Sequence, residues 1–252
     1  MQLKAGCLPR GRSLRFTREP ECAGIRASGS NELFRALPLR FHGSADLREV
    51  ICDIGNERPL PMEFSKMGDA LQPIFRVAVL NGGLPFHAAL IEKNGTGVLI
   101  GARGRTGKST CARRIPPPWR ALADDEALIV RTGPGRYSVH PLPTWSEYVR
   151  GRTGRTWNVS ESVPLRGVFF LEQCDHDQAS PRSQGESAMK LHYLACEVFS
   201  AGFGGPPTAS SRTFQLSSFD SSSHIARSVP CFTLKATRTG RFWEEIERVL
   251  SL

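Results

Sequence analysis

The fold class is decided by the stretch Gly97-Val-Leu-Ile-Gly-Ala-Arg-Gly-Arg-Thr-Gly-Lys-Ser-Thr110. Its apolar start predicts a buried strand, and residues 110–115 before Pro116 predict a short helix. A glycine-rich loop between a strand and a helix is the context of a phosphate-binding loop, or P-loop. Glycines let backbone N–H groups curl around a phosphate, and the helix N-terminus adds its positive dipole. The alternative interpretation is a basic turn with a structural role.

Every residue of this loop is a candidate for contacting nucleotide phosphates: Ala102, Arg103, Gly104, Arg105, Thr106, Gly107, Lys108, Ser109 and Thr110. Lys108 is expected to neutralise the β- and γ-phosphates, and the Ser109 hydroxyl to ligate Mg²⁺. Ala102 stands where the first glycine of the motif is usual, and Arg105 stands where a glycine is common. An arginine there needs a tolerable backbone conformation, and its guanidinium is able to face the phosphates.

Asp124, Asp125 and Glu126 lie in residues 121–130, an otherwise apolar run that predicts a strand. A structural core avoids carboxylates, so these acids point to function. At the end of a strand, the side chains of Asp124 and Asp125 could both reach one site and serve as a metal ligand and a base. A solvated acidic turn is the alternative. For His87, at the start of a predicted strand over 87–92, a functional role and simple packing are equally compatible with the pattern.

The remaining patterns predict an α/β chain with a small N-terminal segment of unknown role at residues 1–72 and a nucleotide-binding domain at residues 73–252. Further strands are expected at 75–80, 136–140, 163–173 and 231–235, and helices at 187–199 and 241–250. Residues 175–186 predict a polar loop. The glycine-rich and serine-rich residues 202–223 predict a loop or a partly disordered segment.

The composition excludes several classes of protein. The 252 residues are 40% hydrophobic, and the apolar runs are too short to cross a bilayer. Because no apolar leader follows the N-terminus, we expect a cytoplasmic protein without a membrane partner. The formal net charge of +9 raises nucleic acid as a partner, but residues 101–120 hold six cations and no acid on the loop motif itself, and no DNA-binding motif occurs. Seven cysteines without a CxxC pair suggest neither a disulfide framework nor a zinc site.

A family resemblance rests on these motifs in their order along the chain. His87, a hairpin, the Gly-Lys-Ser-Thr loop, a short helix and then Ala123-Asp-Asp resemble the catalytic domain of HPr kinase/phosphorylase. The longer sequence motifs, which are most specific over residues 82–145, are more similar to the SynChlorMet cassette protein ScmC group of HPr kinase-related proteins. The resemblance covers about residues 75–250. It implies a P-loop domain with a mixed sheet of the HPr kinase/phosphoenolpyruvate carboxykinase type, and not a doubly wound Rossmann sheet.

The resemblance also implies a function. It suggests an ATP- and Mg²⁺-dependent kinase that transfers the γ-phosphoryl group to a hydroxyl, expected to be a serine, of a peptide or small protein. Asp124 is expected to act as base and Asp125 as metal ligand beside Ser109, with Lys108 and His87 near the transferred phosphate. Implied partners are a PqqD-like peptide-binding protein and radical SAM enzymes of the same cassette. Because HPr kinases form hexamers, a homo-oligomer is also implied.

The alternative function is a nucleotide-binding accessory protein that handles the precursor peptide without phosphotransfer. Trp119, Trp145 and Trp157 are interpreted as packing residues, and His140 has no assigned role.

Overall fold

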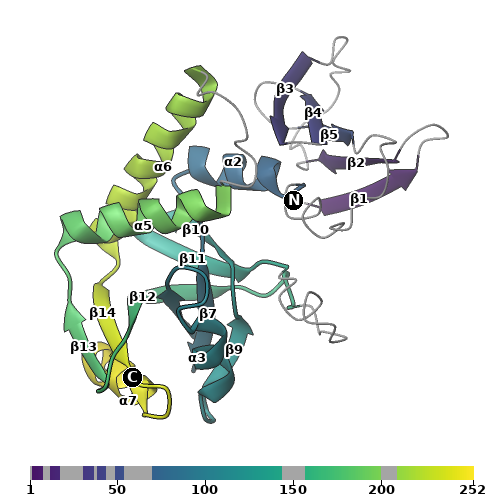
Figure 1. Ribbon diagram of the computed structural model, residues 1–252. Coiled ribbons are helices and arrows are strands. Elements are labelled where there is room, and N and C mark those ends of the chain that lie inside the picture. The colour runs from purple at the N-terminus through teal and green to yellow at the C-terminus, as the bar shows by residue number, and fades with distance from the viewer. Residues whose placement is uncertain are drawn as a thin grey trace. The chain divides into compact units, whose positions relative to one another are not determined.

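A computed structural model describes residues 2–7, 12–17, 31–36, 39–43, 49–53, 70–143, 157–199 and 209–252 (Figure 1). The chain forms two compact units. The first comprises Met1–Val77 with Phe199–Pro207, and the second comprises Ala78–Val198 with Thr208–Leu252. The division falls inside a helix, α2 (Gln72–Leu80).

The first unit contains an antiparallel sheet of five short strands. Its spatial order is β1 (Gln2–Cys7), β2 (Arg12–Thr17), β5 (Glu49–Asp53), β4 (Leu39–Gly43) and β3 (Asn31–Ala36). Every neighbouring pair in it is antiparallel. Strands joined in sequence pair as hairpins at its two ends, β1 with β2 and β3 with β4.

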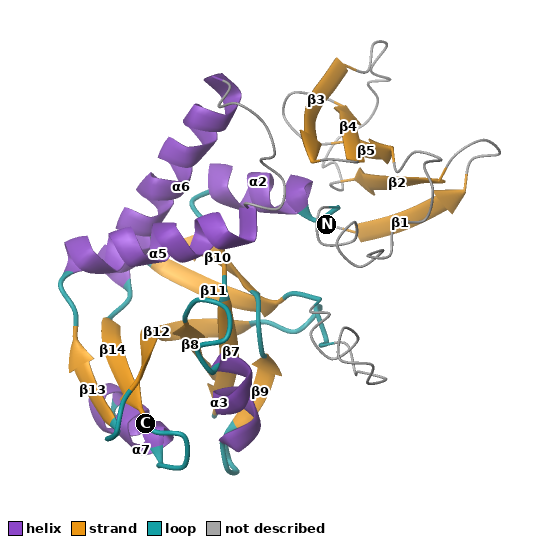
Figure 2. Ribbon diagram, in the orientation of Figure 1, coloured by secondary structure: helices purple, strands orange, loops and turns teal. Residues whose placement is uncertain are grey.

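The second unit is built on a nine-stranded sheet (Figure 2). Its main path is β6 (Leu84–Phe86), β10 (Ala127–Gly133), β11 (Arg136–Pro141), β12 (Val163–Gln173), β8 (Thr96–Gly101), β7 (Ala88–Lys93) and β9 (Arg120–Ala123). Beside β12 follow β14 (Cys231–Ala236) and β13 (Gln178–Pro181). The sheet is mostly antiparallel, but β12 runs parallel to both β8 and β14. The protein is therefore of the mixed α/β class.

Helices cover the core that lies on one face of this sheet. Alternate residues of the central strands, among them Ile100 and Phe169, pack with α3 (Lys108–Arg114) and α7 (Phe242–Leu250) in one cluster. The apolar residues of α7 recur at helical spacing and are buried at Phe242, Ile246 and Leu250. The intervening strand residues face the other way, where Phe86 packs edge-on against Phe170. Both faces of the central strands are thus buried, which explains their continuous apolar sequence.

Several predictions of local structure were wrong. Residues 75–80 were expected to be a strand but belong to α2. Apolar and polar residues alternate there, yet Phe75, Ala78 and Val79 are the buried ones, and their spacing is that of a helix. The serine-rich region was expected to be a loop, but α6 (Ala209–Ser228) occupies most of it.

Several serines of α6 donate their hydroxyls to carbonyls of the same helix, while Ser221 donates to the carbonyl of Val79 on α2. Ser222 donates to the carbonyl of Ser218 at 2.8 Å, and Ser228 donates to that of His224 at 3.0 Å. Such bonds to the preceding turn remove the competition that usually favours loops, and the buried Ile225 anchors the helix. The expected loop at 175–186 likewise contains β13 and the start of α5 (Gln184–Phe199). Among the described helices, none is long and apolar enough to cross a membrane.

The stacked pair of Phe169 on β12 and Phe232 on β14 gives a test of this core, since their ring centroids lie 4.8 Å apart. Phe169 is fully buried, so Phe169→Ala should lower the free energy of unfolding by about 3–5 kcal/mol. Urea unfolding measures this loss. Leu216→Ala on α6 is the control, because a side chain that is 68% exposed should change stability by no more than about 0.5 kcal/mol. Equal effects of the two substitutions would contradict the described core.

Candidate functional site

The glycine-rich loop, defined here as residues 102–107, joins the end of β8 to α3. Gly107 has a φ of 119°, a left-handed conformation in which a Cβ is unfavourable. Arg105 also has a positive φ of 65° and is exposed. The chain thus adopts at Arg105 a backbone conformation that favours glycine, at a cost of about 1 kcal/mol or more. This explains why a glycine is common there and shows that the arginine does not prevent the turn.

Lys108, the first residue of α3, is only 4% exposed. Its ammonium donates to the carbonyl oxygens of Ala102 at 2.9 Å and Arg103 at 3.2 Å, so it lies against the glycine-rich loop. Its Nζ is also 3.7 Å from Oδ1 of Asp125. Burial lowers the pKa of Lys108, while the charges of Asp125 and Glu197 act in the opposite direction.

Asp124 and Asp125 form a bend between β9 and β10, where a single strand had been expected. Asp124 is 6% exposed and accepts a hydrogen bond at 3.1 Å from the indole N–H of Trp157. The hydroxyl of Ser109 donates to the main-chain oxygen of Asp124 at 3.4 Å, so the bend adjoins the start of α3. The two carboxylates have different neighbours, because Asp125 contacts His87 and Lys108 instead.

His87 lies between β6 and β7, and both of its ring nitrogens meet carboxylates. Nε2 is 2.9 Å from Oδ1 of Asp125, and Nδ1 is 3.0 Å from Oε2 of Glu197. Burial by itself lowers the pKa of His87, but the hydrogen bonds with Asp125 and Glu197 outweigh it and raise the pKa above its ordinary value. The doubly paired imidazole therefore favours its protonated form.

Lys108, Asp125 and His87 form a charged cluster. Glu197 on α5 is a further member of this cluster, which the sequence analysis missed. Besides His87, its carboxylate accepts a hydrogen bond at 3.1 Å from Nε of Arg103 in the glycine-rich loop. Burial raises the pKa of Glu197, but the pairing with His87 and Arg103 lowers it overall. Because Glu197 is 110 residues from His87, no local pattern indicates the contact.

The family model described as SynChlorMet cassette protein ScmC matches residues 50–251. This chain belongs to the ScmC family. No curated protein matches it. The matched span includes the glycine-rich loop, the bend at Asp124 and Asp125, and α5 with Glu197, so the whole cluster lies in the shared part of the chain.

The structure also places two of the tryptophans, His140 and Thr110, which the sequence analysis had named. Trp119 is buried and donates from Nε1 to Glu247 at 2.7 Å, and Trp157 hydrogen-bonds Asp124 as described above. Trp145 lies outside the described residues. His140 is on β11, where burial lowers its pKa. Thr110 lies within α3.

Glu126, which follows the bend, is one of the acids in residues 121–130 that pointed to function, but the sequence assigned it no role. Burial and the neighbouring negative charge of Asp125 raise its pKa from 4.5 to about 7, despite the opposing charges of His87 and Lys108. A carboxyl that titrates near neutral pH is suited to exchanging protons, and such groups concentrate at functional sites.

This shift predicts a pH-dependent stability. Between about pH 4.5 and 7 the folded chain keeps a proton on Glu126 that the unfolded chain releases. Glu126 therefore makes the free energy of unfolding fall as pH rises through this window. Glu126→Gln should reduce that fall and stabilise the protein relative to wild type at pH 8 more than at pH 5, as measured by urea unfolding. Glu172→Gln, at the exposed end of β12, is the control and should leave the pH profile unchanged. Parallel profiles for wild type and Glu126→Gln would contradict the shift.

Proposed function

We propose that this chain is an HPr kinase-like P-loop phosphotransferase, which uses ATP and Mg²⁺ to phosphorylate a hydroxyl of a peptide or small protein from its cassette. One observation carries the proposal. Beside the glycine-rich loop, the Asp125 carboxylate lies 3.7 Å from the Lys108 ammonium and 2.9 Å from the His87 ring. A buried lysine and a carboxylate beside a glycine-rich loop are groups that enzymes of phosphoryl transfer use, and the imidazole of His87 holds that carboxylate in place.

The glycine-rich loop supports phosphate binding. Left-handed residues at Arg105 and Gly107 turn the backbone tightly, and such turns gather N–H groups toward an anion. Lys108 adds a point charge directly after the turn. The loop is also supported from β12, because the side-chain amide of Gln173 at the end of that strand donates to the carbonyl of Thr106 at 3.0 Å. A nucleoside triphosphate, with several adjacent anionic oxygens, is the ligand that fits a cationic loop of this kind.

Ser109 and Asp125 are the residues that would hold Mg²⁺. Both offer hard oxygen ligands, which this cation prefers. Burial raises the pKa of Asp125, but His87 and Lys108 lower it overall, so the carboxylate stays ionised as a metal ligand must. When bound, Mg²⁺ would supply charge neutralisation to the phosphates. His87 and Glu197 would hold Asp125 and Arg103 in place around them.

Asp124 is the residue that we assign as the base, which takes the proton from the acceptor hydroxyl. Its main-chain oxygen accepts a hydrogen bond from Ser109, so it lies beside the proposed magnesium ligand. Glu126 competes for this role, because its pKa of about 7 is close to the ideal for a general base. The mixed sheet, with parallel β8, β12 and β14 among antiparallel strands, supports the HPr kinase/phosphoenolpyruvate carboxykinase type of fold.

The deciding experiment incubates the protein with ATP, Mg²⁺ and the precursor peptide of its cassette. Mass spectrometry should show a gain of about 80 Da, the mass of one phosphoryl group, on a hydroxyl residue of the peptide. MgATP binding without any transfer would favour the nucleotide-binding accessory protein instead. Absence of MgATP binding would overturn both functions.

Lys108→Ala should abolish MgATP binding in calorimetry, because it removes the cation that lies on the loop. Lys190→Ala is a matched control, since Lys190 lies on α5 with its ammonium 5.8 Å from the Tyr193 ring centroid. Its MgATP affinity should equal that of wild type. Unchanged affinity in Lys108→Ala would refute the assignment of the loop.

Substitutions of the three neighbouring acids, Asp124, Asp125 and Glu126, should give different phenotypes. Asp125→Asn should weaken MgATP binding, because an amide oxygen is a poorer ligand for a hard cation than a carboxylate. Asp124→Asn should retain MgATP but lose about 10²–10⁴-fold in transfer rate. Glu126→Gln should keep transfer within a few fold. If Glu126→Gln loses the rate and Asp124→Asn keeps it, the base is Glu126, and a pH–rate inflection near 7 should then disappear in that variant.

A further inference from the structure

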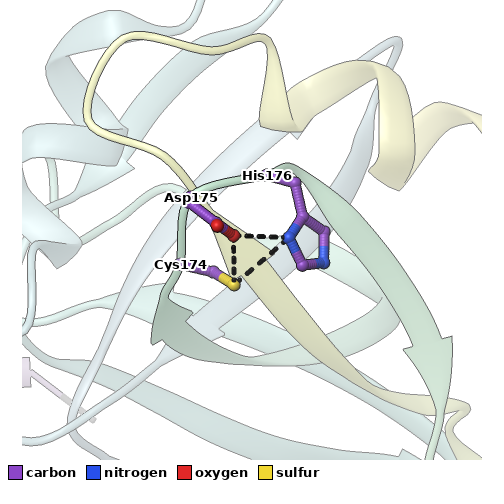
Figure 3. Close-up of side chains that lie close together, drawn as sticks. All are labelled: Cys174, Asp175 and His176. Carbon is purple, nitrogen blue, oxygen red and sulfur yellow. Dashed lines mark hydrogen bonds and ion pairs between the residues drawn. The ribbon is translucent and has the colours of Figure 1, made fainter.

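Three side chains with metal-ligating atoms meet directly after β12, at Cys174, Asp175 and His176 (Figure 3). The sulfur of Cys174 lies 3.4 Å from Oδ1 of Asp175 and 3.4 Å from Nδ1 of His176. That Nδ1 is 2.7 Å from the same carboxylate oxygen. Successive residues in a strand point to opposite faces, so it is the bend at residues 175–176 that brings the three together.

The triangle of ligand atoms has nearly the size that a tetrahedral metal requires. Zinc lies about 2.3 Å from sulfur and about 2.0–2.2 Å from nitrogen and oxygen, which places pairs of ligands about 3.4–3.6 Å apart. The two distances to sulfur already match this spacing. The nitrogen and oxygen, now joined by a hydrogen bond, need to separate by about 0.7 Å, which side-chain rotations of exposed residues permit.

The turn is anchored at both ends to the end of β14 and the residue that follows it. The backbone N–H of Cys174 donates to the carbonyl of Ala236 at 3.1 Å, and the side-chain carboxylate of Asp177 accepts the N–H of Thr237 at 2.6 Å. Arg114 on α3 in turn donates to the carbonyl of Thr237 at 3.1 Å. Because the backbone is already held, binding a metal would order only the side chains, which reduces the entropic cost.

The choice of ligands selects the metal. A thiolate and an imidazole favour a borderline or soft cation such as Zn²⁺, and they disfavour Mg²⁺, which prefers oxygen. The side chain of His176 is 53% exposed and that of Asp175 is 93% exposed, so a metal held there would reach solvent. Three protein ligands and a solvent position form an open coordination sphere.

We propose that Cys174, Asp175 and His176 bind one Zn²⁺ ion in an open, exchangeable site that is separate from the proposed magnesium site. On binding, the thiol proton of Cys174 passes to solvent and its sulfur joins the metal. The hydrogen bond to Asp175 requires the ring proton of His176 on Nδ1, so on binding this proton shifts through solvent to Nε2 and Nδ1 offers its lone pair, while Asp175 offers a carboxylate oxygen. Because one proton is released, the affinity falls as pH is lowered.

Cobalt tests this site in the full-length protein without a histidine tag. Co²⁺ should bind at one equivalent with a thiolate-to-cobalt charge-transfer band, and Zn²⁺ should displace it. Cys174→Ser should abolish the band. His176→Gln and Asp175→Asn should each weaken Zn²⁺ binding by about tenfold or more, as measured by competition with a chromophoric chelator. Thermal melting in Zn²⁺ gives a second readout, because binding to the folded chain raises Tm in wild type and not in Cys174→Ser.

Two control variants make the result specific. Cys196→Ser removes another described thiol that contacts a histidine, with its sulfur 3.7 Å from Nε2 of His192, and it should keep the cobalt band. Lys108→Ala should also keep it, so the zinc site can stand or fall independently of the nucleotide site. A band that survives Cys174→Ser, or no binding of either metal at about 100 μM, would overturn the proposal.

Discussion

The parallel pairing of β12 with β8 is the constraint on which both proposed sites depend. In this pairing Val168 lies beside Leu99 and Phe170 beside Gly101, and both strands are buried on their two faces where residues 167–170 of β12 pair with β8. Because parallel strands end at the same edge of a sheet, the turn after β12 must lie next to the loop after β8. The Gln173 side chain bonds that loop directly, and the next residues are the Cys174 turn.

The second organising feature is the charged cluster, in which each buried or half-buried charge faces one of opposite sign. Lys108 and His87 would each be costly to bury alone, and both face Asp125. Glu197 extends the pairing to Arg103, so a residue on α5 is coupled to the conformation of the glycine-rich loop. Removing one member leaves its partner charged and unpaired, so substitutions here affect stability as well as ligand binding. Burial and, after it, the charge of Asp125 raise the pKa of Glu126, which lies at the edge of this cluster.

Local patterns predicted most of the second unit. The apolar strand at 163–173 coincides with β12, the strand expected at 87–92 is β7 at 88–93, and the helix expected at 110–115 is α3 at 108–114. The failures occurred where local preference and burial disagree. In α2 a short alternating run favoured a strand, and in α6 the serines favoured a loop, yet buried residues such as Phe75 and Ile225 stabilise both as helices. For the first 72 residues the patterns were too weak to predict a role.

The glycine-rich loop, its lysine and serine, and the acidic pair are predictable from the sequence alone, because each depends on neighbouring residues and on backbone preferences that act over a few positions. The tertiary structure alone decided which groups meet. It brought Glu197 into contact with His87. It also gave the two aspartates different partners, since Asp124 bonds Trp157 and Asp125 lies near Lys108. Finally, it held the turn at Cys174 against the end of β14. These contacts join residues far apart in the chain, and they exist only because burial of the sheet brings its strand ends and α5 together.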